Sequence, residues 1–474
     1  MRFILRQPLV ANYNKRQKNM TTNNPSFFER ANNWLKRSIS IRLFTIGILI
    51  LLLLIPVSMV ESLIREREAR QEEAIVEVSS KWGEQQTITG LVLTVPYKTY
   101  SKVYEGEKTD KFKLVESREY AHFLPEELNI NGDILPEVRY RGIYEVIVYN
   151  SKIKLTGKFS TPNFEEWKID KNNIIWEDAF ISLGLSDLRS IQENISVKWN
   201  DKQYFFNPGV ESSDVIQNGI SSRLPINHSD SIKTKTEFSL DLNFNGSTSI
   251  NFIPLGKLTK VNIKSKWQNP SFIGSFLPDE REINTDGFSA NWKVLHLNRP
   301  YPQNFRGSVQ GIYESSFGVN LIVPVDEYQK SMRSAKYAVI FITLTFLIFF
   351  FVQILNGVKI HPIQYIIVGL ALCVFYTLLI ALSEHIAFKF SYLISSVSII
   401  GLITLYAKSI FNNKKLTTLI CLILATLYLF IYSIIQMEDY ALLMGSVGLF
   451  IVLATIMYLS RKIDWYAIKT KGDD

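Results

Sequence analysis

The sequence predicts a membrane protein with six transmembrane α-helices, one N-terminal and five C-terminal, and a large β-rich, sandwich-like antiparallel domain between the first and second helices. Three observations support this fold class. From residue 337 to residue 460, only eight of 124 residues are Asp, Glu, Lys or Arg. A second apolar stretch, Leu43–Val60, lies near the N-terminus. The region between the two has short segments in which apolar and polar residues alternate, which is typical of strands.

The overall composition conceals this division of the chain. The apolar share is 47% and the charged share is 20%, as in an ordinary globular protein. The formal net charge is +8. Because the Lys and Arg residues lie beside apolar segments, they are better explained by membrane orientation than by nucleic-acid binding. We therefore expect the lipid bilayer, and no nucleic acid, as a partner.

The first 80 residues should form a tail, a membrane anchor and a stalk. Residues 1–40 are polar and basic, and we expect a disordered cytoplasmic tail. Residues 41–62 are predicted as the first transmembrane helix. Its apolar core is longer than that of a cleaved signal peptide, and no small-residue cleavage site follows, so it should be a signal anchor. Residues 63–80 are rich in charge and contain no Gly or Pro, which indicates a helical stalk.

Residues 81–330 should form the β-rich exported domain. Phe238, Leu240 and Leu242 alternate with polar residues up to Asn245-Gly246, a pair that is typical of a two-residue hairpin turn. The segment from Gly142 to Phe159 alternates in the same way, and we expect a second turn at Asn150-Ser151. Cys373 and Cys421 are the two cysteines, and both lie in apolar segments, so neither a disulfide nor a Cys-based zinc site can form in this domain.

Residues 331–460 should form a bundle of five membrane-spanning helices, followed by a cytoplasmic tail at residues 461–474. A span needs about 20 apolar residues to cross the hydrocarbon layer. Five segments qualify, at about 337–358, 361–383, 390–407, 416–437 and 440–460. Lys and Arg residues gather on alternate connections, which predicts that both chain termini are cytoplasmic and that the large domain lies on the opposite side.

The sequence predicts no catalytic residue, no cofactor and no metal ligand. There is no phosphate-binding G-x-x-x-x-G-K-[ST] motif and no G-x-S-x-G nucleophile motif. The five histidines are scattered and show no spacing that is typical of a metal site. We therefore expect that the protein is not an enzyme.

One group of charged residues is a candidate site at the outer membrane face. Glu384-His385 ends one predicted span and Glu438-Asp439 ends another. Arg333 and Lys336 lie at the same level, and Asp326 lies just above it. Such groups can simply sit among lipid headgroups. Alternatively, they form a polar cluster that holds the exported domain against the bundle or binds a lipid headgroup. In that second interpretation, Glu384 and Asp439 are at least partly buried.

Short strings spread along the chain, from about Ser38 to Tyr466, match the pattern of a known family. These strings are Trp82-Gly83-Glu84-Gln85-Gln86, Gly90, Pro96-Tyr97, Arg141-Gly142-Ile143-Tyr144-Glu145, Ser186-Asp187-Leu188-Arg189, Trp267-Gln268-Asn269-Pro270-Ser271-Phe272, Phe276-Leu277-Pro278, Leu297-Asn298-Arg299, Pro324-Val325-Asp326-Glu327-Tyr328, His361-Pro362-Ile363-Gln364-Tyr365, Ser383-Glu384-His385, Glu438-Asp439-Tyr440-Ala441-Leu442-Leu443 and Arg461-Lys462-Ile463-Asp464-Trp465. In these strings the chain resembles the CreD family of bacterial inner-membrane proteins, which are associated with cell-envelope integrity.

The resemblance implies a multi-pass protein of the inner membrane with a periplasmic domain, and a role in envelope integrity or stress response without assigned chemistry. A binding or structural role of that domain fits best. Two alternatives stay open: a transporter or lipid-handling protein, and an enzyme that acts on an envelope polymer. Beyond the bilayer, the expected partners are another envelope protein, a lipid headgroup or a peptidoglycan fragment.

Overall fold

The structure is a computed structural model that describes residues 39–104, 112–224, 226, 236–322, 327–437 and 440–461. The predicted disordered tail before residue 39 and the predicted tail after residue 461 lie outside the described residues. The chain divides into two compact units. One, here called the β-domain unit, comprises Ser62–Lys330 with Ser383–Ala387, and the other, the membrane unit, comprises the remaining segments.

A single long helix, α2, runs from Ile39 to Trp82 and belongs in part to each unit. Its first half is apolar and includes Pro56, and its second half carries the charges of the stalk. Within that second half, Arg70 pairs with Glu66 and Lys81 pairs with Glu77 one turn away. Such pairs support a solvent-exposed helix. The membrane anchor and the stalk are therefore one uninterrupted helix.

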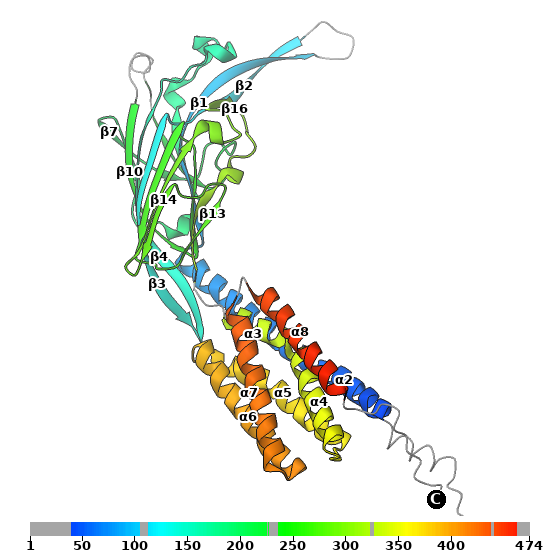
Figure 1. Cartoon of the computed structure of the whole chain (residues 1–474). Helices are drawn as coiled ribbons and strands as arrows, with labels where there is room; N and C mark the ends of the chain where they lie inside the picture. Colours follow the sequence, from blue (N-terminus) through cyan, green and yellow to red (C-terminus); the bar gives the residue numbers. More distant parts are fainter. Residues whose placement is uncertain are drawn as a thin grey trace, which may run out of the picture. The chain divides into compact units, whose positions relative to one another are not determined.

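Two mixed sheets make up the β-domain unit (Figure 1). Among the described residues, the first sheet has nine strands: β1 (Gln86–Tyr104), β2 (Phe112–Phe123), β5 (Phe180–Leu185), β8 (Asn207–Pro208), β9 (Gly219–Arg223), β11 (Ser249–Ile253), β13 (Pro270–Gly274), β16 (Asn304–Arg306) and β17 (Phe317–Leu321). Seven of them follow in the order β13-β17-β11-β1-β5-β9-β8, while β2 pairs with β1 and β16. Most pairs are antiparallel, but β1 and β11 run parallel.

The second sheet has eight strands in the described part of the chain: β3 (Glu127–Arg141), β4 (Tyr144–Phe159), β6 (Ser196–Trp199), β7 (Lys202–Phe205), β10 (Thr236–Ser247), β12 (Leu258–Ser265), β14 (Glu280–Asn284) and β15 (Gly287–Leu295). Their order is β14-β15-β12-β3-β4-β10-β6-β7. All pairs are antiparallel except β3 with β12. The strand β12 buries alternate side chains, with Val261 and Ile263 between the exposed Lys260 and Lys264.

Apolar side chains from both sheets form one continuous core, so the domain is a β-sandwich. Ile88 and Leu93 of the first sheet and Ile130 and Leu242 of the second are no more than 1% exposed. Large aromatic side chains such as Trp292 are also buried there. These strands, with the transmembrane helices described below, confirm the predicted fold class.

Two predicted turns are wrong. Asn245-Gly246 lies inside β10, and Asn150-Ser151 lies inside β4. The two pairs face each other across adjacent strands, where Asn150 Nδ2 donates to Asn245 Oδ1 at 3.0 Å. Gly246 is needed for space instead, because a Cβ atom there would overlap the Tyr149 ring.

The actual turns fall at other residues. Gly142, with a φ of +64°, turns the chain between β3 and β4. At Thr248, with a φ of +58°, the chain leaves the second sheet and enters β11 in the first. Asn-Gly therefore precedes a crossing between sheets and does not close a hairpin.

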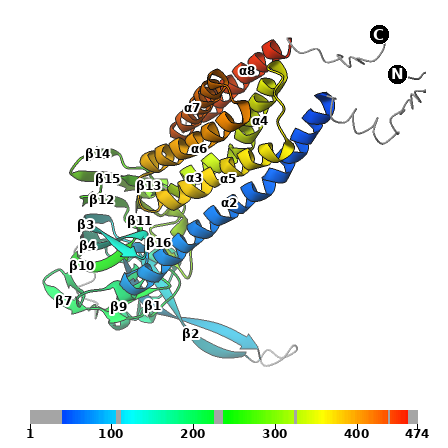
Figure 2. The ribbon, with the colours of Figure 1, turned by 90° about the horizontal axis from the view of Figure 1, so that it is seen from below.

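Six helices among the described residues are long and apolar enough to span a membrane: α2, α4 (Ala338–Leu355), α5 (Pro362–Ser383), α6 (Phe388–Phe411), α7 (Lys414–Gln436) and α8 (Ala441–Ser460). A short helix, α3 (Glu327–Lys336), precedes α4. Figure 2 shows α4 to α8 side by side with the first half of α2. Apolar side chains such as Leu442 of α8 are largely exposed, as expected of helices that face lipid.

Hydrogen bonds and one close approach at a glycine connect helices of the bundle. Tyr365 of α5 donates a hydrogen bond to Gln353 of α4 at 2.9 Å, and Tyr392 of α6 donates to the backbone carbonyl of Tyr428 of α7 at 2.8 Å. Gly369 of α5 lies against Leu53 of α2, so any larger residue there would overlap Leu53. A small residue thus lets two membrane helices approach closely.

Candidate functional site

The connection between α5 and α6, Ser383–Ala387, belongs to the β-domain unit. Its Glu384 side chain is only 10% exposed. Glu384 Oε1 lies 3.5 Å from Nε of Arg67 on α2, and it accepts a hydrogen bond from the Tyr328 hydroxyl at 3.4 Å. Burial, together with the Glu384 carboxylate, raises the pKa of the Tyr328 hydroxyl far above its usual value. Tyr328 therefore stays protonated and serves Glu384 as a donor.

A cavity of about 340 Å³ adjoins this contact. We call it the Glu384 cavity. It is lined by residues from α2, from the β3–β4 turn, from α3 and from the α5–α6 connection, namely Gln71, Ile143, Tyr144, Glu145, Glu327, Tyr328, Ser383, Glu384, His385, Ile386 and Ala387. Because Ser383 ends one transmembrane helix and Phe388 begins the next, covalent connection alone keeps this loop close to a membrane surface.

The structure places only part of the predicted polar cluster. Glu384 and His385 both line the cavity, Glu384 mostly buried and His385 exposed. Arg333 and Lys336 lie in the last turn of α3, within the membrane unit. The other three predicted members, Asp326, Glu438 and Asp439, lie outside the described residues. The cluster as a whole stays a prediction.

Sequence reasoning missed the two residues that contact Glu384. Arg67 looked like one of many charges on the stalk, and Tyr328 is separated from Glu384 by 56 residues. A signal did exist for Tyr328 and for the cavity residue Tyr144, because both occur in strings that carry the family resemblance.

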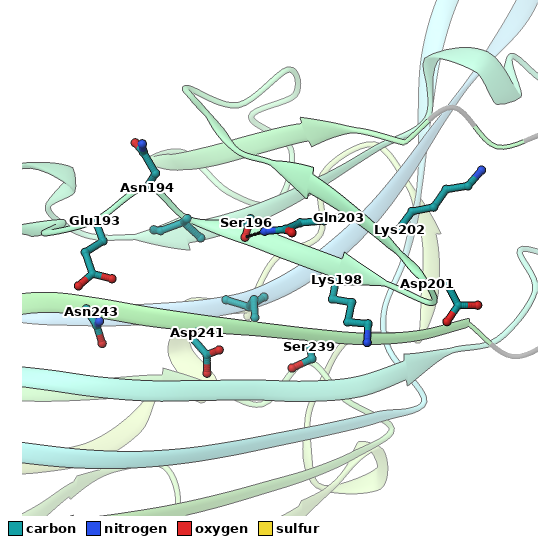
Figure 3. Close-up of a pocket in the computed structure, with 12 residues that line it drawn as sticks. Glu193, Asn194, Ser196, Lys198, Asp201, Lys202, Gln203, Ser239, Asp241 and Asn243 are labelled. Carbon is teal, nitrogen blue, oxygen red and sulfur yellow. Dashed lines mark hydrogen bonds between the residues drawn. The ribbon is translucent and has the colours of Figure 1, made fainter.

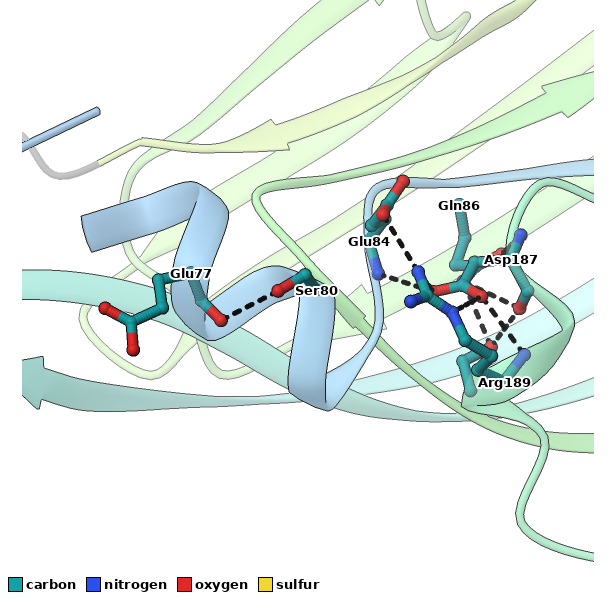
Figure 4. A network of polar contacts seen from close by, with 7 residues as sticks. Glu77, Ser80, Glu84, Gln86, Asp187 and Arg189 are labelled. Carbon is teal, nitrogen blue, oxygen red and sulfur yellow. Dashed lines mark hydrogen bonds and ion pairs between the residues drawn. The ribbon is translucent and has the colours of Figure 1, made fainter. Parts of the chain in front are cut away.

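A second polar cluster fixes the end of α2 to the β-domain, and we call it the α2 junction (Figure 4). Asp187, just after β5, has a side chain that is 6% exposed. Its Oδ1 accepts from Arg189 Nε at 2.9 Å, and its Oδ2 accepts from the backbone N–H of Glu84 at 3.2 Å. Arg189 also donates to Glu84 Oε1 at 2.9 Å. Beside them the buried Gln86 donates to the Asp187 backbone carbonyl at 3.3 Å.

Electrostatics favour the ionised form of Asp187. Burial acts to raise the pKa of its carboxyl, but hydrogen bonds from Arg189 and from the backbone N–H groups of Glu84 and Arg189 outweigh it and hold the pKa below its usual range. The same bonds keep the Arg189 guanidinium charged, since the Asp187 carboxylate raises its pKa.

The residues before Glu84 complete the α2 junction. The Trp82 indole N–H donates to the Tyr149 carbonyl at 3.2 Å, and the Arg139 guanidinium lies 3.7 Å from the Trp82 ring centre. Gly83 has a φ of +148°, and a Cβ atom there would lie 2.8 Å from the Asn245 carbonyl oxygen. The two strings Trp82–Gln86 and Ser186–Arg189, which carry the family resemblance, thus meet in one junction at the end of α2.

The outer face of the second sheet carries another cavity, of about 400 Å³ (Figure 3). Polar side chains of β6, β7, the turn between them, β10 and the segment before β6 line it, including Glu193, Lys198, Asp201, Lys202, Ser239 and Asp241. Among these residues, Gln203 Nε2 donates to Ser196 Oγ at 2.8 Å. A solvated face of an antiparallel sheet has this composition, and it points to no particular chemistry.

Within the described part of the chain, no group of three His, Cys, Asp or Glu residues could hold a metal ion. Cys373 is buried in α5 and Cys421 is half-buried in α7, both as free thiols. These features define a multi-pass membrane protein that carries a β-sandwich domain.

The chain belongs to the CreD family, because the model of the family described as "Inner membrane protein CreD" matches residues 38–466. A protein of that description from Escherichia coli (strain K12) is 32% identical over 426 residues, which cover 88% of this chain and 92% of that protein. The resemblance inferred from the sequence is confirmed, and the chain is a multi-pass inner-membrane protein.

The search of solved structures matched M1 zinc metallopeptidases. A mutant of such an enzyme from Deinococcus radiodurans, bound to a Tyr-Ser-Ala substrate, is 7% identical with a TM-score of 0.22, and the match covers 45% of this chain and 53% of that one. The enzyme without the mutation is 6% identical with a TM-score of 0.20 and the same coverage. At such TM-scores the likeness supports no conclusion about fold or activity.

Proposed function

We propose that this protein contributes to cell-envelope integrity or to the envelope-stress response through a periplasmic domain with a binding or structural role, and that it catalyses no reaction. Membership of a family whose members are described as inner-membrane proteins supports the proposal. The two strings at the α2 junction also support it, because their polar side chains form hydrogen bonds to backbone groups and to one another.

The observation that carries the proposal is the continuity of α2. The helix has 44 residues, so at 1.5 Å per residue it is about 66 Å long, and its C-terminal end is fixed in the β-domain by the α2 junction. A transmembrane anchor and a folded domain that share one helix can transmit displacement from one to the other. This is the property expected of a structural envelope protein.

The orientation belongs to the proposal as well. Lys359, Lys408, Lys414 and Lys415 lie at connections between helices on one side of the bundle, and Arg461 follows α8 on that side. Since positive residues are retained in the cytoplasm, both termini are cytoplasmic and the β-domain is periplasmic. Ser383–Ala387 then lies at the periplasmic surface. There it can contact a lipid headgroup, another envelope protein or a peptidoglycan fragment.

The contact between Glu384 and Arg67 gives a test in cells. Cells that lack this protein should take up more of a dye that an intact envelope excludes, and the parent gene should restore exclusion. Glu384→Arg should fail to restore it, because it sets two positive charges close together at a largely buried position. The double variant Arg67→Glu with Glu384→Arg should regain at least part of the function, because it re-forms the pair in reverse.

The matched control is Glu177→Arg, which makes the same change at an exposed carboxylate of the β-domain and should behave like the parent. Immunoblots should confirm equal amounts of each variant in the membrane. If deletion leaves dye exclusion intact, the envelope role is wrong. If Glu384→Arg complements fully, the ion pair has no part in that role.

A further inference from the structure

A chain of hydrogen bonds begins in the core of the first sheet and ends at a cavity wall. Thr94 of β1 is 2% exposed, and its hydroxyl lies 3.0 Å from Nδ1 of His122 on β2, which is 1% exposed. Nε2 of His122 lies 3.1 Å from Oδ2 of Asp214, whose side chain is 30% exposed. The hydroxyl of Ser212 donates to the same oxygen at 2.8 Å. The polar contacts of the buried threonine and histidine thus lead outward to a carboxylate that solvent can reach.

The position of the hydrogen on the His122 ring follows from the geometry of these hydrogen bonds. An ionised Asp214 can only accept, so Nε2 of His122 must carry a hydrogen, and Nδ1 of the neutral ring accepts from the Thr94 hydroxyl. Burial lowers the pKa of His122, and Asp214 offsets this only in part, which agrees with a neutral ring. Both ring nitrogens are then satisfied, and one carboxylate is fixed in position from within the protein.

A hydroxyl residue, His and Asp also make up nucleophilic triads, but the hydrogen-bonded series Thr94–His122–Asp214 cannot act as one. A triad needs its hydroxyl in contact with substrate. Here Thr94 is enclosed by the core, and it is Asp214 that faces the cavity. We therefore treat Thr94 and His122 as positioning residues and Asp214 as the group that meets a ligand.

The cavity has about 380 Å³, within the range of ~300–1,000 Å³ that is usual for small-molecule sites. The loop before β9 and the loop after β16 form it. Its polar lining includes Ser213, Asp214, Gln217, Ser308, Gln310 and Glu314. Two of its described lining residues are acidic, Asp214 and Glu314, and none of them is Lys, Arg or His. At its edge the Tyr313 side chain is 47% exposed.

We propose that this cavity binds an amino sugar, with the primary ammonium at Asp214 and the hydroxyl groups at the surrounding Ser and Gln side chains. The carboxylate supplies charge and hydrogen-bond acceptors, and a primary ammonium is the donor that matches both. Hydroxyl and amide side chains match a polyhydroxylated ring, and the exposed Tyr313 ring offers a flat surface to its apolar face. The inference does not depend on the proposed envelope role.

The test uses the full-length protein in detergent and two probes that differ at one group. Glucosamine carries the ammonium, and N-acetylglucosamine replaces it by a neutral amide. Glucosamine should raise the melting temperature of the protein in a saturable way, because a ligand that binds only the folded state stabilises it. N-acetylglucosamine and ammonium chloride at equal concentration should not. Asp214→Asn should weaken the response to glucosamine by about tenfold or more.

Two further variants separate positioning from folding. His122→Gln keeps an N–H group that can donate to Asp214 and should retain most of the affinity. His122→Leu cannot donate and should lose affinity as Asp214→Asn does. Asp133→Asn, an exposed carboxylate on β3 outside this cavity, is the matched control and should bind like the parent.

Each contrary result would overturn the proposal. Equal responses to the two sugars, or to ammonium chloride alone, would show that no amino sugar is recognised. No response to glucosamine would exclude this ligand class. An unchanged response in Asp214→Asn would place the binding elsewhere, and this variant alters only the partly exposed end of the chain, so it decides the matter even if His122→Leu fails to fold.

Discussion

Asp187 shows how much structure one buried carboxylate can organise. It accepts hydrogen bonds from the backbone of Glu84 and from the backbone and side chain of Arg189, and its own carbonyl accepts from Gln86. Because Glu84 and Gln86 lie about 100 residues before Asp187 in the chain, the carboxylate joins the end of α2 to the segment after β5. Replacing one carboxylate oxygen there should loosen both segments.

We expect Asp187→Asn to lower the free energy of unfolding by about 1–3 kcal/mol at neutral pH, since it removes charge-assisted bonds from a buried group. The pKa of Asp187 is lowered in the folded protein, so its stabilisation is present above the unfolded pKa and is lost as pH falls through the folded pKa. The difference from the parent should therefore shrink in acid. Denaturant unfolding at several pH values measures it, with Asp241→Asn, an exposed carboxylate on β10, as the control. A difference that persists in acid would contradict the linkage.

Single residues also show what sequence reasoning can and cannot locate. Glu384 could be predicted as a candidate because it is an ionisable residue at the end of an apolar segment, and such positions stand out without any structure. Its partner Arg67 could not, because a contact over hundreds of residues depends on the fold and not on spacing. The chain from Thr94 through His122 to Asp214 was missed for the same reason.

At the scale of elements, periodicity predicted strands and helices, but residues that are typical of turns led to two wrong turn predictions. Asn-Gly is a turn signal because both residues tolerate positive φ. At Asn245-Gly246 a different property is used, the absence of a side chain beside the Tyr149 ring. The strand β4 likewise runs through Asn150-Ser151 without a break, because Ser151 donates to the Phe244 carbonyl on the neighbouring strand. A Gly or Asn that satisfies a neighbour cannot be told from a turn residue in sequence alone.

Helix packing in the membrane unit gives the next prediction. Gly369 lies where α5 meets Leu53 of α2 and Phe346 of α4, whereas Gly401 of α6 has open space beside it. Gly369→Val should overfill the contact and cost about 1–3 kcal/mol, as inserted atoms do in a packed interior. Gly401→Val should have little effect. Melting of the purified proteins in one detergent measures both, and equal melting temperatures would show that this contact does not limit stability.

For the whole molecule, the number and type of membrane-spanning elements could be predicted because the membrane imposes strict rules. A spanning segment must be apolar and helical over its full length, so six such helices are visible in the sequence. The arrangement of the 17 described strands in two sheets could not be predicted from the sequence. Parallel pairs such as β1 with β11 join segments more than 150 residues apart, and no local pattern indicates them.

The sidedness of the protein is the property on which the proposed function depends most directly. If both termini are cytoplasmic, a phosphatase reporter fused after Asn207 in the β-domain should be active, because that enzyme folds only after export. A fluorescent reporter that folds only in the cytoplasm should be bright after Phe411, at the end of α6, and at the C-terminus. The reason is the excess of Lys and Arg at connections on that side, which resists transfer across the membrane.

Adding Lys residues within the short Ser383–Ala387 connection should disturb this topology more than adding them within the large domain, where positive charges have little influence on orientation. A reversed signal after Asn207 would exclude a periplasmic β-domain. A reversed signal after Phe411 or at the C-terminus would show that the predicted number of membrane-spanning helices before that point is wrong.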